Sequence, residues 1–261
     1  MTNILFLYNN LVDAATLTAS SANANFPVAN LKNPLRTKTW KTAGATAGTA
    51  NVVCNFGSPQ SINCIALTGY DWTSAPGTLQ VEFNASDSWG APAVTKILTW
   101  AASPTVNGNK AAIILLFDSI SYRYARLNVV YSPGGTPLDW NLGRIFIGEA
   151  FQPAQHYAHG FRTRLVDPSL SAYSVGNQCY TDEVEKYRIV TMNFAKITEA
   201  QWLLFQKMFN TVGKSRPLFI ALDYDGSPNE KTIYGQFQDL PEGEDIVTSR
   251  QSFGVTFREA C

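Results

Sequence analysis

The first 150 residues consist of short runs rich in β-branched and aromatic residues, separated by Gly, Pro, Ser and Asn. This punctuation is typical of strands joined by turns, and almost no helical periodicity interrupts it. The runs predict eight strands: Asn3–Tyr8, Ala50–Phe56, Ile62–Thr68, Thr78–Ala85, Thr95–Trp100, Ala111–Phe117, Tyr122–Tyr131 and Arg144–Glu149. Strands at this spacing, with no helices between them, predict a β-sandwich of the jelly-roll kind.

The second part of the chain contains one strong helix pattern. Thr198 and Gln201 match a capping box, in which the threonine caps the helix and the Gln201 side chain reaches back to the cap amide. Apolar residues then repeat along one helical stripe: Trp202, Phe205, Phe209 and Val212. Gly213 is expected to end the helix with a left-handed cap, so the pattern predicts one long helix between Thr198 and Gly213.

A change of character near Phe151–Ala158 predicts a linker, because Gln, Pro and Ala gather there. We therefore expect two domains, a β-sandwich over 1–152 and a smaller β-rich α+β domain over 153–261. Four strands are expected to accompany the helix of the second domain: Glu185–Phe194, Leu218–Asp223, Lys231–Phe237 and Ser249–Arg258. The predicted fold class is mainly β.

The charge content is low. Only 15% of the residues are charged, the formal net charge is zero, and 45% are hydrophobic. A surface with so few charges has little electrostatic protection against association, so we expect partner subunits to cover much of it. There is no basic footprint for nucleic acid and no apolar run of the roughly 20 residues that a membrane span needs. Met1–Tyr8 lacks a basic leader region, which favours a first strand and synthesis in a cytoplasm.

Motifs for catalysis are missing, since the sequence has no GxSxG, no P-loop and no HExxH. His156 and His159, with Asp167 near them in sequence, are either metal ligands or ordinary surface and interface side chains. One acidic segment fits either half of a calcium loop or an ordinary hairpin turn: Asp223, Asp225, Asn229 and Glu230. The ordinary interpretation is favoured in both places, so no enzyme activity, metal or cofactor is expected.

The cysteines and the aromatic residues leave alternatives open. If Gly57–Ser61 closes a hairpin, Cys54 and Cys64 lie opposite each other, but a reducing cytoplasm favours two buried free thiols. Tyr70, Trp72 and Trp89 fall in or next to predicted loops. They either contact a glycan or a partner, or they pack beneath long loops. Packing is the favoured interpretation.

Four segments resemble the opening of discoidin-like, galactose-binding-like jelly rolls: Ala24–Leu31, Arg36–Trp40, Asn51–Phe56 and Ile62–Gly69. In that family a short NL segment leads to a Trp and then to a strand pair, which here reads VVCNFGSPQSINCIALTG. The FPVANL version resembles tail proteins of bacteriophages. The resemblance covers about the first 150 residues and matches no sugar-binding or calcium-binding residue set position by position.

The second part is similar to the C-terminal portion of phage tail and baseplate proteins, through its helix, its Gly-Lys-Ser-Arg-Pro turn and Ile233-Tyr234-Gly235. The strand–helix–strand module resembles the belt of distal tail proteins, although those proteins carry the belt first and the sandwich second. The resemblance implies a ring of copies, six being expected, that joins the tail tube to baseplate hub proteins in the virion tail. The alternative functions are a carbohydrate-binding module that contacts host surface glycans, and a polysaccharide hydrolase.

Overall fold

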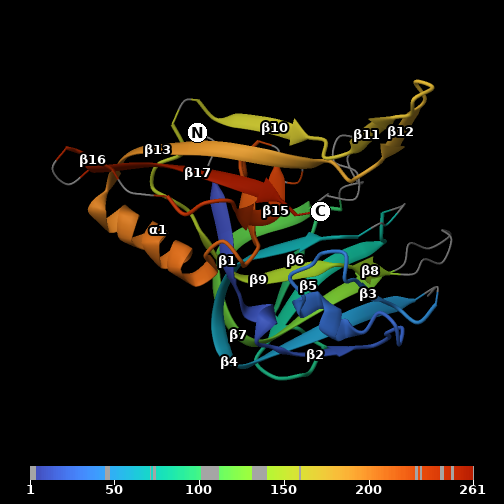
Figure 1. Ribbon diagram of the computed structural model, residues 1–261. Coiled ribbons are helices and arrows are strands. Elements are labelled where there is room, and N and C mark those ends of the chain that lie inside the picture. Colours follow the sequence, from blue (N-terminus) through green and yellow to red (C-terminus); the bar gives the residue numbers. More distant parts are fainter. Residues whose placement is uncertain are drawn as a thin grey trace. The chain divides into compact units, whose positions relative to one another are not determined.

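The structure is a computed structural model, and it describes residues 4–44, 48–70, 72, 75–100, 112–130, 140–158, 160–226, 229, 231–241, 244–247 and 250–260. The chain forms two compact units, and strands dominate both (Figure 1). The first unit comprises Met1–Gln152 and Leu218–Tyr234, and the second comprises Pro153–Pro217 and Gly235–Cys261. In the part of the chain that is described, no helix has the length and apolar character to cross a membrane.

The first unit is built almost entirely from strands. Its strands are β1 (Leu5–Asn10), β2 (Thr16–Ala19), β3 (Trp40–Lys41), β4 (Thr49–Thr68), β5 (Thr78–Asn84), β6 (Val94–Ile97), β7 (Ala112–Val130), β8 (Asn141–Leu142), β9 (Arg144–Phe151) and β14 (Leu218–Ala221). Two short 3₁₀ turns complete it, η1 (Leu11–Asp13) and η2 (Val28–Lys32). Strand β15 (Thr232–Phe237) is shared by the two units, which divide it after Tyr234.

Two long strands, β4 and β7, pass through both layers of a sandwich. The first half of β4 and the second half of β7 join the layer β6-β5-β7-β4-β2, where β7 pairs with β5. Their other halves join the layer β7-β4-β9-β1-β14. The change of layer falls where the β4–β7 register shifts, between Asn55 and Gln60 and between Ile62 and Cys64. Bulges bend a strand and increase its twist, which lets one strand turn the corner of a sandwich. The prediction of a β-sandwich is confirmed.

The sequence prediction divided each of these long strands in two. Ala50–Phe56 and Ile62–Thr68 are one strand, β4, so no hairpin closes at Gly57–Ser61. Ala111–Phe117 and Tyr122–Tyr131 correspond in the same way to β7. Polar and small residues at the corner, such as Ser58 and Ser61, look like a turn in the sequence, because they are exposed where the strand bends.

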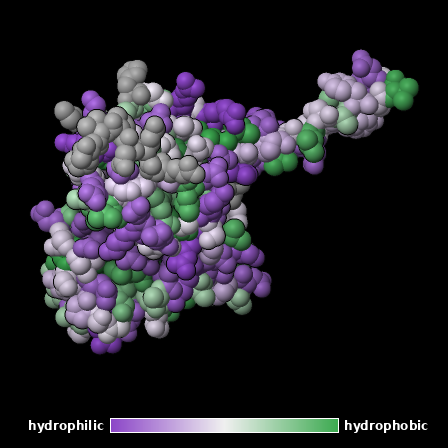
Figure 2. Space-filling view, turned by 60° about the vertical axis from the view of Figure 1, so that its left-hand side comes forward, coloured by the Kyte–Doolittle hydropathy of each residue, from purple (hydrophilic) through white to green (hydrophobic). Residues whose placement is uncertain are grey.

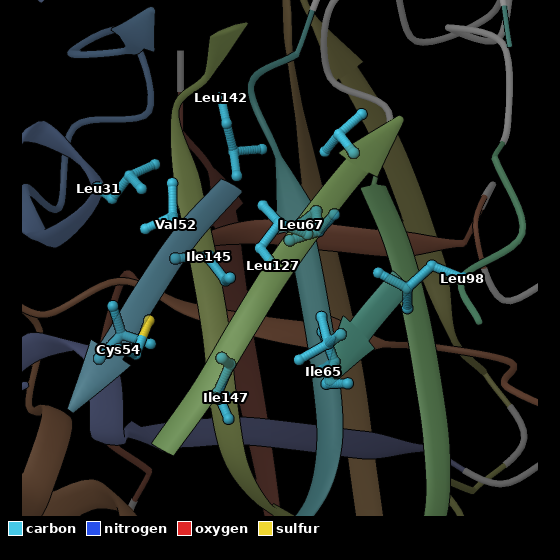
Figure 3. Close-up of a cluster of buried hydrophobic side chains, with 14 of the residues drawn as sticks. Leu31, Val52, Cys54, Ile65, Leu67, Leu98, Leu127, Leu142, Ile145 and Ile147 are labelled. Atoms are coloured by element: carbon cyan, nitrogen blue, oxygen red, sulfur yellow. The ribbon is translucent and has the colours of Figure 1, made fainter. Parts of the chain in front are cut away.

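The main core lies between the two layers (Figure 3). Val52, Cys54 and Leu127 belong to one layer, while Ile65 and Ile147 belong to the other, and all five side chains are fully buried. The Ile145–Ile147 part of β9 is apolar because it is buried on both faces. Phe146, on its other face, contacts Phe219 edge to face, at 6.3 Å between the ring centroids. A strand buried on both sides reads as a continuous apolar run, as IFI does here.

The segment Leu218–Tyr234 belongs to the first unit, although the expected ranges 1–152 and 153–261 place it in the second domain. The reason is backbone pairing: β14 extends the layer beside β1, from Leu5 opposite Ala221 to Leu7 opposite Phe219. A strand that returns from a distant part of the chain leaves no local sequence signal.

The second unit consists of an antiparallel sheet with one helix on it, and a separate hairpin. Its elements are β10 (Arg162–Val166), β11 (Leu170–Tyr173), β12 (Cys179–Asp182), β13 (Tyr187–Thr198), α1 (Glu199–Val212), β16 (Glu244–Val247) and β17 (Arg250–Glu259). The order β10-β13-β17 continues to the Gly235–Phe237 part of β15, and β16 also pairs with β17.

Helix α1 packs on the sheet through the predicted stripe. Phe205 contacts Phe194 and Phe253, with centroid distances of 4.9 Å to each. Thr198 accepts a hydrogen bond from the Gln201 amide through Oγ1, and Gly213 ends the helix at a φ of 56°. The Gln201 side chain does not complete the capping box. Its Oε1 instead accepts from the Ala154 amide at 3.0 Å, and so fixes the segment that was expected to be a linker.

Candidate functional site

Two of the three predicted contact aromatics lie in the core of the first unit. Tyr70 and Trp72 are buried, with ring centroids 4.8 Å apart, and Trp72 meets Trp140 edge to face at 5.3 Å. The Trp72 indole donates to the Asn141 carbonyl at 2.8 Å, and burial raises the pKa of the Tyr70 phenol. Neither ring presents a face to solvent, so neither can stack on a sugar in this conformation.

Trp89 is the third of these aromatics, and it is half-buried. The Arg126 guanidinium lies over its ring at 4.7 Å from the centroid, within the range of a cation–π contact. The indole N–H donates to Asp87 Oδ1 at 2.6 Å. Trp89 is therefore held at both its face and its edge beside strands β5 and β7.

A polar network continues from Trp89 along the same two strands. The buried Glu82 carboxylate accepts from Arg126 through Oε2, with distances of 2.6 Å to Nε and 2.5 Å to the terminal nitrogen. The Gln80 amide donates to Glu82 Oε1 at 2.7 Å, and the Asn128 amide donates to the same oxygen at 3.4 Å. These residues face each other because Glu82 is opposite Arg126, and Gln80 is opposite Asn128, in the β5–β7 register.

One atom of this network has no partner. The side-chain oxygen Oδ1 of Asn128 is buried and accepts no hydrogen bond. Most buried polar atoms are paired, and leaving one unpaired typically costs about 1–3 kcal/mol. We call Gln80, Glu82, Trp89, Arg126 and Asn128 the Trp89 cluster.

The acidic turn between β14 and β15 is occupied by internal contacts. Lys231 pairs with Asp223 Oδ2 at 2.5 Å, and the Gly226 amide donates to Asp223 Oδ1 at 3.0 Å. Two residues of the turn form hydrogen bonds with the backbone of β7: Asn229 Oδ1 accepts from the Ile114 amide, and the Tyr224 hydroxyl accepts from the Leu116 amide. Glu230 lies outside the described residues, and among those described no group of three acidic, His or Cys side chains could hold a metal ion.

The predicted histidine pair is placed only in part. His156 is half-buried with its ring centroid 3.7 Å from that of Tyr157, and His159 lies outside the described residues. Asp167 pairs instead with Lys186 at 3.2 Å. Hydrogen bonds from Ser169, followed by Lys186, hold the pKa of Asp167 below its usual value.

Cys54 and Cys64 are free and buried, which confirms the prediction of two thiols. They lie in different layers, since Cys54 is opposite Ala125 and Cys64 is opposite Leu116 and Gly148. Burial raises the pKa of Cys54 to about 12 and also raises that of Cys64, so both thiols are protonated and unreactive at neutral pH.

The hairpin of β11 and β12 is the feature that the sequence analysis missed, and we call residues 170–182 the arm. Figure 2 shows it as a narrow projection with apolar side chains along it. Its two strands form a sheet of their own, and every strand residue is exposed. Leu170 is 72% exposed, Tyr173 70% and Tyr180 61%, and Val175 in the turn is fully exposed.

Local hydrogen bonds define the shape of the arm. In its turn, the Ser174 amide donates to the Gln178 carbonyl, and Asn177 adopts a φ of 61°. The hydroxyls of Ser171 and Thr181 lie 3.2 Å apart across the strands. Gly176-Asn177 between the short runs LSAY and CYTD is a hairpin signal that the sequence contains. The arm is therefore a formed hairpin that presents apolar side chains to solvent.

The comparisons with known proteins concern the fold. No family model and no curated protein sequence matches this chain. Chitosan-binding module 1 of a chitosanase/glucanase from Paenibacillus sp. IK-5 is 20% identical, with a TM-score of 0.41, and the match covers 54% of this chain and 99% of the module. A fucose-binding module of Streptococcus pneumoniae is 12% identical, with a TM-score of 0.40, over 54% of this chain and 95% of the module.

The lectin domain of lectinolysin, complexed with Lewis B antigen, is a third similar structure. It is 9% identical, with a TM-score of 0.41, over 53% of this chain and 95% of that domain. The evidence that this chain forms a β-sandwich is its own strand pairing. None of these three structures is a phage tail protein, and the resemblance to phage tail proteins stays a prediction.

Proposed function

We propose that this chain is a non-catalytic structural subunit that assembles with copies of itself through the arm. The observation that carries this proposal is the exposure of four large side chains in one short hairpin: Leu170, Tyr173, Val175 and Tyr180. Leu170 and Tyr180 lie on one face of the hairpin and Tyr173 lies on the other, and a soluble monomer rarely leaves so many large apolar side chains of one short segment uncovered without a binding role.

The physics of an isolated hairpin supports the same proposal. A two-stranded hairpin is at best marginally stable in water when nothing covers it. Burying a Val or Leu side chain contributes about 1.5–3 kcal/mol, so a partner that covers several such residues would offset the cost of association. A partner that covers the arm would therefore both stabilise the hairpin and gain affinity from it.

The setting that we propose is a phage tail tip or baseplate, in the virion tail. Its support is the sequence resemblance in both parts of the chain, together with the low charge content and zero net charge. In that setting the subunit forms a ring and contacts the tail tube and the baseplate hub proteins. Such interfaces are obligate and extensive, which fits a subunit that exposes apolar side chains when alone.

The first prediction concerns assembly. Val175→Asp should weaken self-association roughly 10- to 100-fold, because the variant loses about 1.5–3 kcal/mol of apolar burial at the contact. Sedimentation velocity over a concentration series measures this directly. At a protein concentration where wild type and variant are both monomeric, the melting temperature should not change, since Val175 is fully exposed within one chain.

A matched control is available in the first unit. Ile97 on β6 is 70% exposed, so Ile97→Asp makes the same kind of change at a similar exposure. It should leave the association constant at the wild-type value. Equal weakening by both substitutions would mean that general surface hydrophobicity, and not the arm, drives association.

The second candidate function is carbohydrate binding by the first unit. The specific observation that favours it is the Trp89 cluster, which combines an aromatic ring, an Arg–Glu pair and the unpaired oxygen Asn128 Oδ1. Sugars offer apolar ring faces for the half-buried indole and hydroxyl groups for the polar side chains around it. Tyr70 and Trp72 have no part in this candidate site, since the core covers both.

Carbohydrate binding predicts a clear result on a glycan array. Trp89→Ala should weaken binding of any captured glycan by about 2- to 12-fold, since one aromatic contact is worth roughly 0.5–1.5 kcal/mol. Tyr180→Ala, which removes an exposed aromatic from the arm, is the control and should bind normally. If the wild-type protein captures no glycan, this second candidate function is rejected.

A further inference from the structure

The second unit exposes another apolar patch, on helix α1. Leu203 is 57% exposed and Leu204 is 43% exposed, whereas Phe205 and Phe209 on the other side of the helix are buried. An amphipathic helix normally shows polar residues on its outer side. Two adjacent leucines there form an apolar patch that nothing in the described part of this unit covers.

The arm and this patch lie at opposite ends of one strand (Figure 1). Strand β13 follows the arm after residues 183–186, and α1 begins at Glu199, directly after β13 ends. Its 12 residues correspond to about 40 Å at roughly 3.3 Å per residue. An arm at one end of β13 therefore cannot cover the helix at the other end of the same strand.

We propose that the arm of one copy docks on the outer face of α1 in a second copy, at Leu203 and Leu204. This inference rests on the proposed function and names the surface that receives the arm. Apolar residues then meet apolar residues. The charges also match, since the arm ends in exposed Asp182 and the helix carries exposed Lys207 one turn beyond Leu203 and Leu204.

The arm and the α1 patch limit the ways in which copies of the chain can assemble. The arm and the α1 patch are different surfaces on one unit, so each copy can give its arm to one neighbour and receive an arm from another. A contact passed from copy to copy in this way generates a closed ring or an open filament, whereas two copies that exchange arms reciprocally form a two-fold dimer. The zero net charge of the chain means that copies brought together this way do not repel strongly.

A native cysteine allows a direct test. Cys179 on β12 is exposed, while Cys54 and Cys64 are buried and protonated. In the whole chain, with Cys261→Ser as background, Gln206→Cys provides a second reactive thiol on α1, at an exposed position beside Leu203 that leaves both leucines in place. A short bis-maleimide should then join copies into a ladder of dimers, trimers and higher species on a denaturing gel.

Two matched variants control for random collision. Ser58→Cys places the new thiol at an exposed position of the first unit and should give no ladder. Cys179→Ser in the Gln206→Cys chain should abolish the ladder. Association of the uncross-linked protein is measured in parallel by light scattering, so that the inference and the proposed function are tested separately.

The outcomes are distinct. A ladder that requires both thiols supports arm-to-helix docking. Oligomers by light scattering without a ladder overturn this inference but leave the proposed function standing, because the arm then docks elsewhere. A monomer at every concentration overturns both.

Discussion

Gly143→Ala should prevent the first unit from folding stably. A β-carbon at this position would lie far closer to the Arg36 carbonyl oxygen than van der Waals contact allows, and 2.9 Å from the carbonyl carbon. Both groups are backbone, so neither can rotate away. The Gly143 amide also donates to the Thr68 carbonyl at 3.2 Å, which ties the glycine to the end of β4. We expect a loss of about 3 kcal/mol or more in the free energy of unfolding.

Chemical denaturation followed by tryptophan fluorescence measures this loss, because Trp72 and Trp140 lie in the same core. Gly48→Ala is the matched control. It has open space around the added carbon and should change the free energy of unfolding by less than about 0.5 kcal/mol. Wild-type stability in Gly143→Ala would contradict the described approach of the η2–β3 segment to this glycine.

Phe205→Ala should destabilise the second unit by about 3–5 kcal/mol, the usual cost of truncating a buried aromatic side chain. Phe205 is fully buried and lies at the centre of a group of stacked and edge-to-face rings: Phe194, Phe209 and Phe253. Because helix α1 is held to its sheet mainly by these contacts, we also expect loss of helical circular dichroism at a lower temperature.

The control for this variant is Gln206→Ala, one residue further along the helix. Gln206 is exposed, and alanine favours a helix slightly, so its melting temperature should match the wild type. Equal destabilisation by both substitutions would contradict the role given to the Phe205 ring contacts, because Gln206→Ala removes none of them.

The sequence predicted the features that depend on neighbours along the chain. The helix, its Thr198 cap and its Phe205–Phe209 stripe agree with α1, because capping and periodicity are local. The strands of the sandwich were found for the same reason. Features set by distant pairing were not predicted: the corners within β4 and β7 read as turns, and β14 gave no sign that it pairs with β1.

The candidate sites show the same division. Tyr70 and Trp72 follow a strand at a glycine, which resembles an exposed loop in sequence, yet both rings are buried by side chains from distant segments. The arm was missed although Gly176-Asn177 marks its turn, because its strands are only four residues long and rich in small polar residues. The Trp89 cluster depends on the β5–β7 register, which spacing alone cannot give.

Assembly through the arm is the central claim, and the mass of the protein in solution tests it most directly. Size-exclusion chromatography with light scattering should give a multiple of the chain mass for the wild type, and a mass close to one chain for Val175→Asp at the same concentration. A wild-type protein that remains a monomer across the concentration series, or a Val175→Asp variant that assembles as well as the wild type, would contradict the account.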